Sequence, residues 1–329
     1  MRLDELGEFG FLGRIWPRLR GPDSGVVLGS GDDAAVLAFG EGAYLLVSTD
    51  AMVEGRHFRR EWLTPEQIGY RAGAAALSDL AAMGGRARGL LASAALPPEM
   101  AAEEAEALME GLDSAASAAG CCLVGGDLTA SPGLIFLDVV VVGETVRYWP
   151  RSGAQAGEAV LLTGDVGRSA AGLAWLEAGR GMESLPEALR ERFLTPQPAF
   201  DMVEAVHPLG VVTSAIDISD GLLGDLRHVA EASGVQLSIE ADRIPIAEET
   251  RVVADRLGLD PMALALGSGE EYEIAFTVPA DAVGRVLAAV GEAGARAVTV
   301  IGRARAGQGV VVEGAEGLKE GYDHFSRRS

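Results

Sequence analysis

Segments typical of strands alternate with segments typical of helices along almost the whole chain, and this order limits the fold more than any other feature. In the first half, three apolar runs rich in β-branched residues occupy 43–49, 121–125 and 134–143. Two helical segments lie between the first and second of these runs. A chain with this order is expected to fold as an α/β or α+β protein.

The first helical segment carries a complete set of start signals. Thr64 is placed to cap the helix, Pro65 suits its first position, and Gln67 completes a capping box. The glycine pair that begins at Gly84 is expected to end this helix. The second helix is predicted over 98–120.

A second α/β series follows an irregular connector at 147–158. Its expected strands and helices occupy 159–164, 211–218, 221–234, 235–240, 272–278, a helix from about residue 281, and 297–302. With 329 residues, 48% of them hydrophobic, the chain is long enough for two cores. We therefore expect two domains, 1–148 and 149–329.

The charge balance excludes several classes of partner. There are 27 basic and 48 acidic side chains, and the formal net charge is −21, so a nucleic-acid or anionic-membrane surface is not expected.

The chain lacks a signal-peptide pattern and a membrane-spanning run, which favours a cytoplasmic location. Lys319 is the only lysine, so a Walker A loop is absent. A bound nucleotide would rely on metal, backbone amides and arginine.

Asp79 lies on the apolar face of its predicted helix. At about 100° per residue, it falls about 20° from Ile68 and within about 40° of Ala72 and Ala75. It also lies in the last turns, where the helix dipole disfavours a negative charge. A buried carboxylate needs a compensating cation. A metal ion is the preferred interpretation, and a tertiary ion pair is the alternative.

Carboxylates also gather at four other junctions between predicted elements. Each junction alone is typical of a turn or a helix cap, but five such positions in one chain favour a shared site. Oxygen ligands without a His/Cys cluster indicate Mg²⁺, and Mg²⁺ with carboxylates indicates phosphoryl transfer. Backbone amides after Asp220 are expected to receive phosphate oxygens. The four junctions hold Asp32 with Asp33, Asp50, Asp127, and Asp217 with Ser219 and Asp220.

A set of motifs resembles the thiamine-monophosphate kinase family from about Asp32 to Phe325. They include "GDDAAV", "STDAMVEGRHF", "LSDLAAMGG", "GGDLT", "IDISDGLLGDLRH", "GEEYEIAFT" and "GYDHF". The resemblance implies two α/β domains of the aminoimidazole-ribonucleotide synthetase-like kind. It also implies a homodimer formed by joining the N-terminal sheets, with ATP near the domain and subunit junction.

The same resemblance implies ATP-dependent phosphorylation of thiamine monophosphate to thiamine diphosphate, with several Mg²⁺ ions. Residue by residue, it implies ATP contacts at Gly126, Asp127, Arg151 and Ser219, and thiamine monophosphate contacts at His57 and Glu270. The implied metal ligands are Asp33, Ser48, Thr49, Asp50, Asp79, Asp127, Asp217 and Asp220.

Three departures from the family pattern touch acceptor recognition. Lys319 stands where an aromatic residue is usual, Ala76 where an asparagine is usual, and "GSGEEYEI" where "GGEDYEL" is common. Two alternatives therefore stay open beside the kinase. One is a non-catalytic, Mg²⁺-dependent nucleotide sensor, and the other is a superfamily enzyme that acts on a different phosphorylated acceptor.

Overall fold

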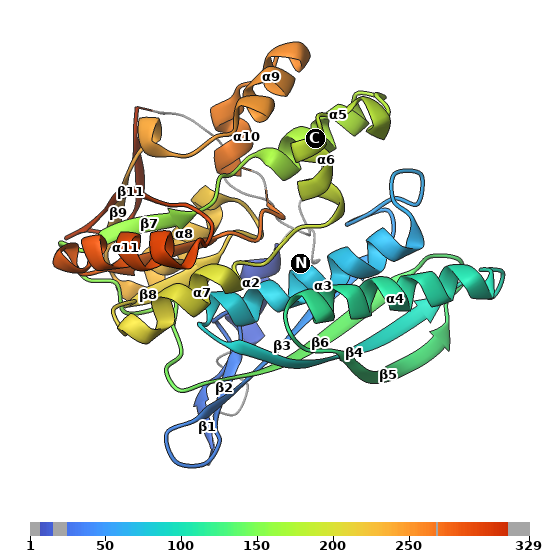
Figure 1. Cartoon of the computed structure of the whole chain (residues 1–329), viewed down its shortest axis with the longest axis horizontal. Helices are drawn as coiled ribbons and strands as arrows, with labels where there is room; N and C mark the ends of the chain where they lie inside the picture. The colour runs from blue at the N-terminus through green and yellow to red at the C-terminus, as the bar shows by residue number, and fades with distance from the viewer. Residues whose placement is uncertain (1–6, 16–24, 268, 315–329) are drawn as a thin grey trace.

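The computed structural model describes residues 7–15, 25–267 and 269–314, and it contains two six-stranded sheets, one in each half of the chain (Figure 1). Each sheet carries helices, so the expected α/β architecture is confirmed. Lys319, Ser268 and the "GYDHF" motif lie outside the described residues. Within the described part, no helix is long and apolar enough to cross a membrane.

The first sheet has the strand order β1-β2-β3-β6-β4-β5, and α3 and α4 lie together on one side of it (Figure 1). The two helices touch closely, because a Cβ atom at Gly69 would lie 1.9 Å from the Leu108 carbonyl oxygen. The elements of this half are α2 (Glu8–Ile15), β1 (Val26–Leu28), β2 (Ala35–Ala38), β3 (Tyr44–Val53), α3 (Pro65–Ala82), β4 (Arg86–Leu96), α4 (Ala102–Ala118), β5 (Leu123–Ala130) and β6 (Phe136–Thr145).

Helix α3 begins and ends where the sequence predicts. The Thr64 hydroxyl accepts the Gln67 N–H, the Gln67 side chain accepts the Thr64 N–H, and the helix ends at Ala82 before the glycine pair. Most of its residues are buried, because the sheet covers one side and α4 another. This rigid, buried helix supplies a stable platform for Asp79.

Two predicted strands extend further than expected. Strand β3 continues to Val53 because its antiparallel pairing with β6 runs unbroken from Tyr44 to Val53. Strand β5 runs from Leu123 to Ala130 as the parallel partner of β4. Asp50 and Asp127 therefore lie within strands and not at strand ends, which corrects the expected positions.

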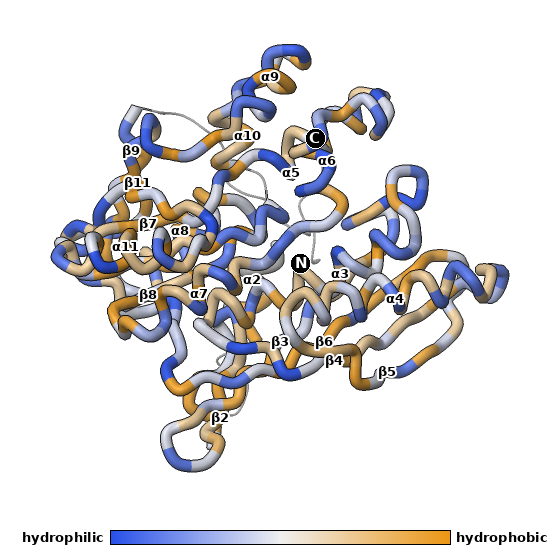
Figure 2. The backbone as a smooth tube through the Cα atoms, in the orientation of Figure 1, coloured by the Kyte–Doolittle hydropathy of each residue, from blue (hydrophilic) through white to orange (hydrophobic). Residues whose placement is uncertain are grey.

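The second sheet has the order β12-β9-β11-β7-β10-β8. Neighbouring residues of β7 enter different hydrophobic clusters, so both faces of this sheet are covered. Figure 2 shows apolar residues along its strands. Its strands are β7 (Ala159–Thr163), β8 (Ser214–Asp217), β9 (Gln236–Glu240), β10 (Ile274–Val278), β11 (Val298–Arg305) and β12 (Gly309–Glu313).

The α-helices of the second half are α5 (Arg168–Glu177), α6 (Glu187–Leu194), α7 (Phe200–Val206), α8 (Leu222–Ser233), α9 (Glu248–Leu257), α10 (Pro261–Gly267) and α11 (Val283–Ala293). Short 3₁₀ turns occupy η2 (Met182–Ser184), η3 (His207–Leu209), η4 (Ala241–Arg243) and η5 (Ala280–Ala282). The connector between the sheets contains Trp149, which is buried against residues of both halves. A domain boundary at 148/149 stays a prediction.

Candidate active site

A cavity of about 630 Å³ lies where elements of the two halves meet. Its walls come from β3, the loop after β3, α3, α5, the junction of β8 with α8, and the segment before β10. Most of the residues expected to form the site line this one cavity: Asp33, Ser48, Thr49, Asp50, His57, Asp79, Arg151, Asp217, Ser219, Asp220 and Glu270.

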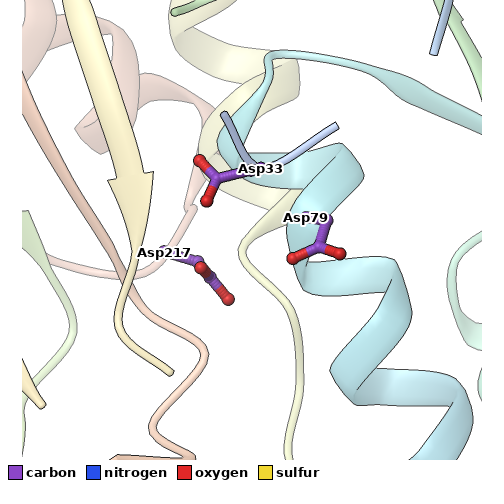
Figure 3. A group of neighbouring side chains, drawn as sticks. All are labelled: Asp33, Asp79 and Asp217. Atoms are coloured by element: carbon purple, nitrogen blue, oxygen red, sulfur yellow. The ribbon is translucent and has the colours of Figure 1, made fainter. Parts of the chain in front are cut away.

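Three carboxylates from separate segments converge in this cavity. Asp33 precedes β2, Asp79 lies in α3, and Asp217 ends β8, and one oxygen atom of each lies within 4.8 Å of the others (Figure 3). Asp33 and Asp217 are buried, at 6% and 2% exposure. The apolar face of α3 thus delivers Asp79 to two further acids, and the described residues provide no ion pair for it.

Hydroxyl groups orient two of the three carboxylates. The Ser48 hydroxyl lies 2.6 Å from Oδ2 of Asp79 and donates to it. The Ser78 hydroxyl donates to Oδ2 of Asp217 over 2.6 Å. These bonds fix the side chains but supply no positive charge, so the repulsion among the acids persists.

The pKa values reflect this crowding. Burial, followed by the charge of Asp33, raises the pKa of Asp217 to about 8. Burial and the charge of Asp217 raise the pKa of Asp79 well above its usual value. Burial also raises the pKa of Asp33, while Arg151 opposes that change. A cation placed among the three would favour the ionised form of each.

Arg151 places a positive charge beside this cluster. Its Nη2 lies 2.5 Å from Oδ1 of Asp33, and its backbone N–H donates to Asp32. The other Asp33 oxygen, Oδ2, is buried and has no hydrogen-bond partner among the described residues. This orphaned oxygen, in an all-oxygen donor set, fits a hard divalent cation such as Mg²⁺.

Strand β3 presents consecutive residues to opposite faces of its sheet. Ser48 and Asp50 lie on the side of α3, and Asp50 lines the cavity. The Thr49 hydroxyl is turned to the other face, where it donates to Asp138 over 2.6 Å. Although Thr49 lines the cavity, its hydroxyl therefore points away from the cluster of Asp33, Asp79 and Asp217.

The start of α8 differs from the expected phosphate site. The backbone N–H groups of Ser219, Asp220 and Gly221 all donate to Oδ2 of Asp225, over 3.1, 3.2 and 3.1 Å. Asp225 is 2% exposed, and burial raises its pKa well above the usual value. The prediction that these amides receive phosphate oxygens is therefore wrong for this structure, because the chain's own carboxylate occupies them.

His57 and Glu270, which are expected to contact the phosphoryl acceptor, also line the cavity. His57 Nδ1 accepts the Val53 N–H over 2.9 Å, so the ring proton of the neutral imidazole is on Nε2. Glu270 is held in a left-handed backbone conformation at φ 59°, with its N–H donating to the Ser219 carbonyl over 2.8 Å. His57 thus offers a hydrogen-bond donor, and Glu270 offers a hydrogen-bond acceptor.

Gly126 and Asp127 do not line this cavity. They lie in β5, which β4 and β6 separate from β3. The glycine permits a close approach, as expected, but to its neighbouring strand: a Cβ atom at Gly126 would lie 1.9 Å from the Ala92 carbonyl oxygen. Within one chain, these two residues stand apart from the rest of the expected site.

Comparisons with known proteins show the family of this chain. The family models "AIR synthase related protein, N-terminal domain" and "AIR synthase related protein, C-terminal domain" match residues 31–145 and 155–315. The thiamine-monophosphate kinase of Mycobacterium tuberculosis is 39% identical over 295 residues, which cover 87% of this chain and 86% of that protein. This chain belongs to the thiamine-monophosphate kinase family.

One further thiamine-monophosphate kinase and one solved structure match nearly the whole chain. The Aquifex aeolicus protein of that name is 35% identical over 326 residues, covering 99% of this chain and 100% of that one. The solved structure of "AaThiL complexed with AMPPCP and TMP" aligns with a TM-score of 0.87 at 33% identity, covering 98% of this chain and 99% of that one. The family expected from the motifs is confirmed.

Four residues that contact site residues of this kinase-family chain were not among the candidates: Arg71, Ser78, Asp138 and Asp225. Arg71 lies in the same mostly buried helix as Asp79. The helical periodicity that identified Asp79 could therefore also have indicated that Arg71 is buried. Asp138 and Asp225 depend on strand pairing and on a local cap, which no spacing rule indicates.

Proposed function

We propose that this protein transfers the γ-phosphoryl group of ATP to thiamine monophosphate and forms ADP and thiamine diphosphate. The convergence of Asp33, Asp79 and Asp217 carries the proposal, because three buried or half-buried acids with an orphaned oxygen need a divalent cation. Membership of the family narrows the choice of phosphoryl acceptor. Relatives named thiamine-monophosphate kinase match most of this chain, and AaThiL is described in complex with AMPPCP and TMP.

The proposed metal ligands are those implied by the family motifs: Asp33, Ser48, Thr49, Asp50, Asp79, Asp127, Asp217 and Asp220. Mg²⁺, when bound, would neutralise the charge of the phosphate oxygens. The described geometry supports Asp33, Asp79 and Asp217 most strongly. Ser48 and Ser78 support the set by holding two of these carboxylates in place.

The chain's own groups align the reactants. The acceptor is an ionised phosphate, so no strong general base is required and catalysis rests on alignment and charge neutralisation. Arg151 supplies a fixed positive charge beside Asp33, and we propose that it and Ser219 contact ATP. His57 would donate a hydrogen bond from Nε2 to thiamine monophosphate, and Glu270 would accept one from it.

We also propose that a second copy of the chain completes the site by bringing Gly126 and Asp127 to the cavity. Strand β5 is exposed along nearly its whole length, and it is the edge of the first sheet (Figure 1). Val124 and Leu128 are 60% and 68% exposed there. Burial of exposed apolar side chains on a sheet edge favours association with another sheet. A cytoplasmic location stays a prediction.

Product analysis tests the proposed function. The purified protein is incubated with Mg-ATP and, in separate reactions, with thiamine monophosphate, thiamine or no acceptor. Thiamine diphosphate and ADP in equal amounts, only in the first reaction, are the expected result. Bound ATP without any product would contradict the kinase and favour the nucleotide sensor, whereas turnover with another phosphorylated compound alone would indicate a different acceptor.

A further inference from the structure

Arg71 is a buried cation that no family motif assigns to the site. It lies in α3 and is 1% exposed. Its Nη2 donates to Oε2 of Glu270 over 2.7 Å, and its Nη1 donates to the Phe193 carbonyl oxygen. Its Cζ lies 4.7 Å from the centre of the Phe193 ring. Arg71 itself does not line the cavity, but both residues that it holds do.

These contacts join three parts of the chain beside the cavity. Arg71 belongs to the first half, whereas Phe193 lies in α6 and Glu270 in the segment before β10. Gly269 packs closely against the Ser219 carbonyl oxygen, where a Cβ atom would lie 1.8 Å away, and the Glu270 N–H donates to the same oxygen. These contacts hold the backbone at Glu270, and the hydrogen bond from Arg71 holds its side chain.

We propose that Arg71 is a positioning residue that sets the acceptor-binding geometry of Glu270. This inference rests on the proposed function. Arg71 occupies Oε2 of Glu270, while Oε1 has no hydrogen bond to any described residue. Because the charge of Glu270 is already balanced, its role is to accept a directed N–H bond, such as one from an aminopyrimidine ring, and not to attract a cation.

The central test is the variant Arg71→Lys. Lysine keeps the charge but loses the planar fork that reaches Glu270 and the Phe193 carbonyl together. Loss of one charge-assisted hydrogen bond predicts a rise of about tenfold or more in KM for thiamine monophosphate. KM for ATP and kcat should change by less than about twofold. A purely structural role would instead affect both substrates together.

A double-mutant cycle tests whether Arg71 acts through Glu270. In a Glu270→Gln background, the further change Arg71→Met should raise the acceptor KM by less than about twofold. The double variant leaves no unpaired buried charge, so it can replace Arg71→Lys in the test if that single variant fails to fold. Arg296→Lys is the matched control, since Arg296 is another largely buried arginine with acid partners, Asp201 and Glu273, and lies outside the cavity.

The outcomes separate the two proposals. Only the proposal for Arg71 would be overturned if the wild-type protein forms product and Arg71→Lys changes both KM values equally. Additive effects in the double-mutant cycle would overturn it as well. Calorimetric binding of thiamine monophosphate in the presence of AMPPCP gives a readout without turnover. A wild-type protein that binds the acceptor but does not phosphorylate it would contradict the proposed function while the Arg71 comparison still applies. Absence of binding would overturn both.

Discussion

The Ser78 hydroxyl donates a 2.6 Å hydrogen bond to Oδ2 of Asp217 and so connects helix α3 to strand β8 of the other half. Ser78 and Asp79 are neighbours, and Asp79 meets Asp217 in the carboxylate cluster. The contact between the two halves of the chain is therefore also part of the proposed metal site. Any change in how α3 lies against β8 would alter the separation of the carboxylates.

Replacement of this hydroxyl should weaken metal binding without removing a ligand. Ser78→Ala leaves Oδ2 of Asp217 without its donor, at a cost of about 1–3 kcal/mol. We expect the Mg²⁺ concentration for half-maximal activity to rise about 5-fold or more, with kcat at saturating Mg²⁺ changed little. A magnesium titration of product formation measures both values. Ser238→Ala is the control, because Ser238 donates a similar 2.6 Å hydrogen bond to Glu313 outside the cavity. Equal magnesium titration curves for the wild type and Ser78→Ala would contradict the expectation.

The dimer proposal predicts complementation between inactive subunits. Asp127→Asn should abolish turnover at any Mg²⁺ concentration while the fold stays intact, because a metal ligand is lost. Asp217→Asn should do the same. If Asp127 acts in the partner's cavity, a mixed dimer of the two variants contains one complete site, and co-expression should restore part of the activity. Mixed dimers without activity, or a normal rate for Asp127→Asn alone, would contradict the assignment.

His57 should affect the acceptor more than the nucleotide. His57→Ala removes the Nε2–H donor proposed to contact thiamine monophosphate, so KM for that substrate should rise about tenfold while KM for ATP changes by less than about twofold. Steady-state kinetics with each substrate varied in turn provides the comparison. Equal increases in both constants would indicate that His57 only supports the loop after β3.

Glu271 should make the fold less stable as pH rises. It is fully buried, its Oε1 accepts the N–H groups of Gly167 and Ser169, and burial raises its pKa from 4.5 to about 8. Its folded-state pKa lies above the unfolded value, so its contribution is fully present below about pH 4.5 and is lost as pH rises through about 8. Glu271→Gln should therefore raise the melting temperature by several degrees at pH 8 and have little effect near pH 4.5.

Glu273→Gln provides the contrast in the same melting experiment. Glu273 is also buried, but burial is outweighed by Arg192 and Arg296, and its pKa is lowered. Its folded-state pKa lies below the unfolded value, so its stabilisation is present above the unfolded pKa and lost on acidification. Loss of this charge leaves two arginines underpaired and should lower the melting temperature at pH 8. Parallel pH profiles for both variants would contradict the assigned pKa directions.

The sequence predicted helix α3 and Asp79 well because their signals are local. A capping box and a glycine pair define the helix, and its 3.6-residue period places Asp79 on a buried face. Strand β4 was missed because its sequence, rich in alanine and arginine, has low strand propensity. Pairing on both sides, with β5 and β6, makes it a strand.

The remaining differences arise from contacts between distant residues. Asp225 caps the start of its own helix and takes the amides that a sequence pattern reserves for phosphate. The distance of Asp127 from the cavity follows from the strand order, which cannot be read from the order along the chain. Arg71 reaches Glu270 across 199 positions of sequence. Periodicity can show that such a cation is buried, but not what it holds.

The proposed metal site is tested most directly by a crystal structure of the protein with Mn²⁺, AMPPCP and thiamine monophosphate, with anomalous scattering used to locate the metal. We expect a manganese peak in contact with carboxylate oxygens of Asp33, Asp79 and Asp217. An ordered structure with both ligands bound and no metal among these three carboxylates would contradict it.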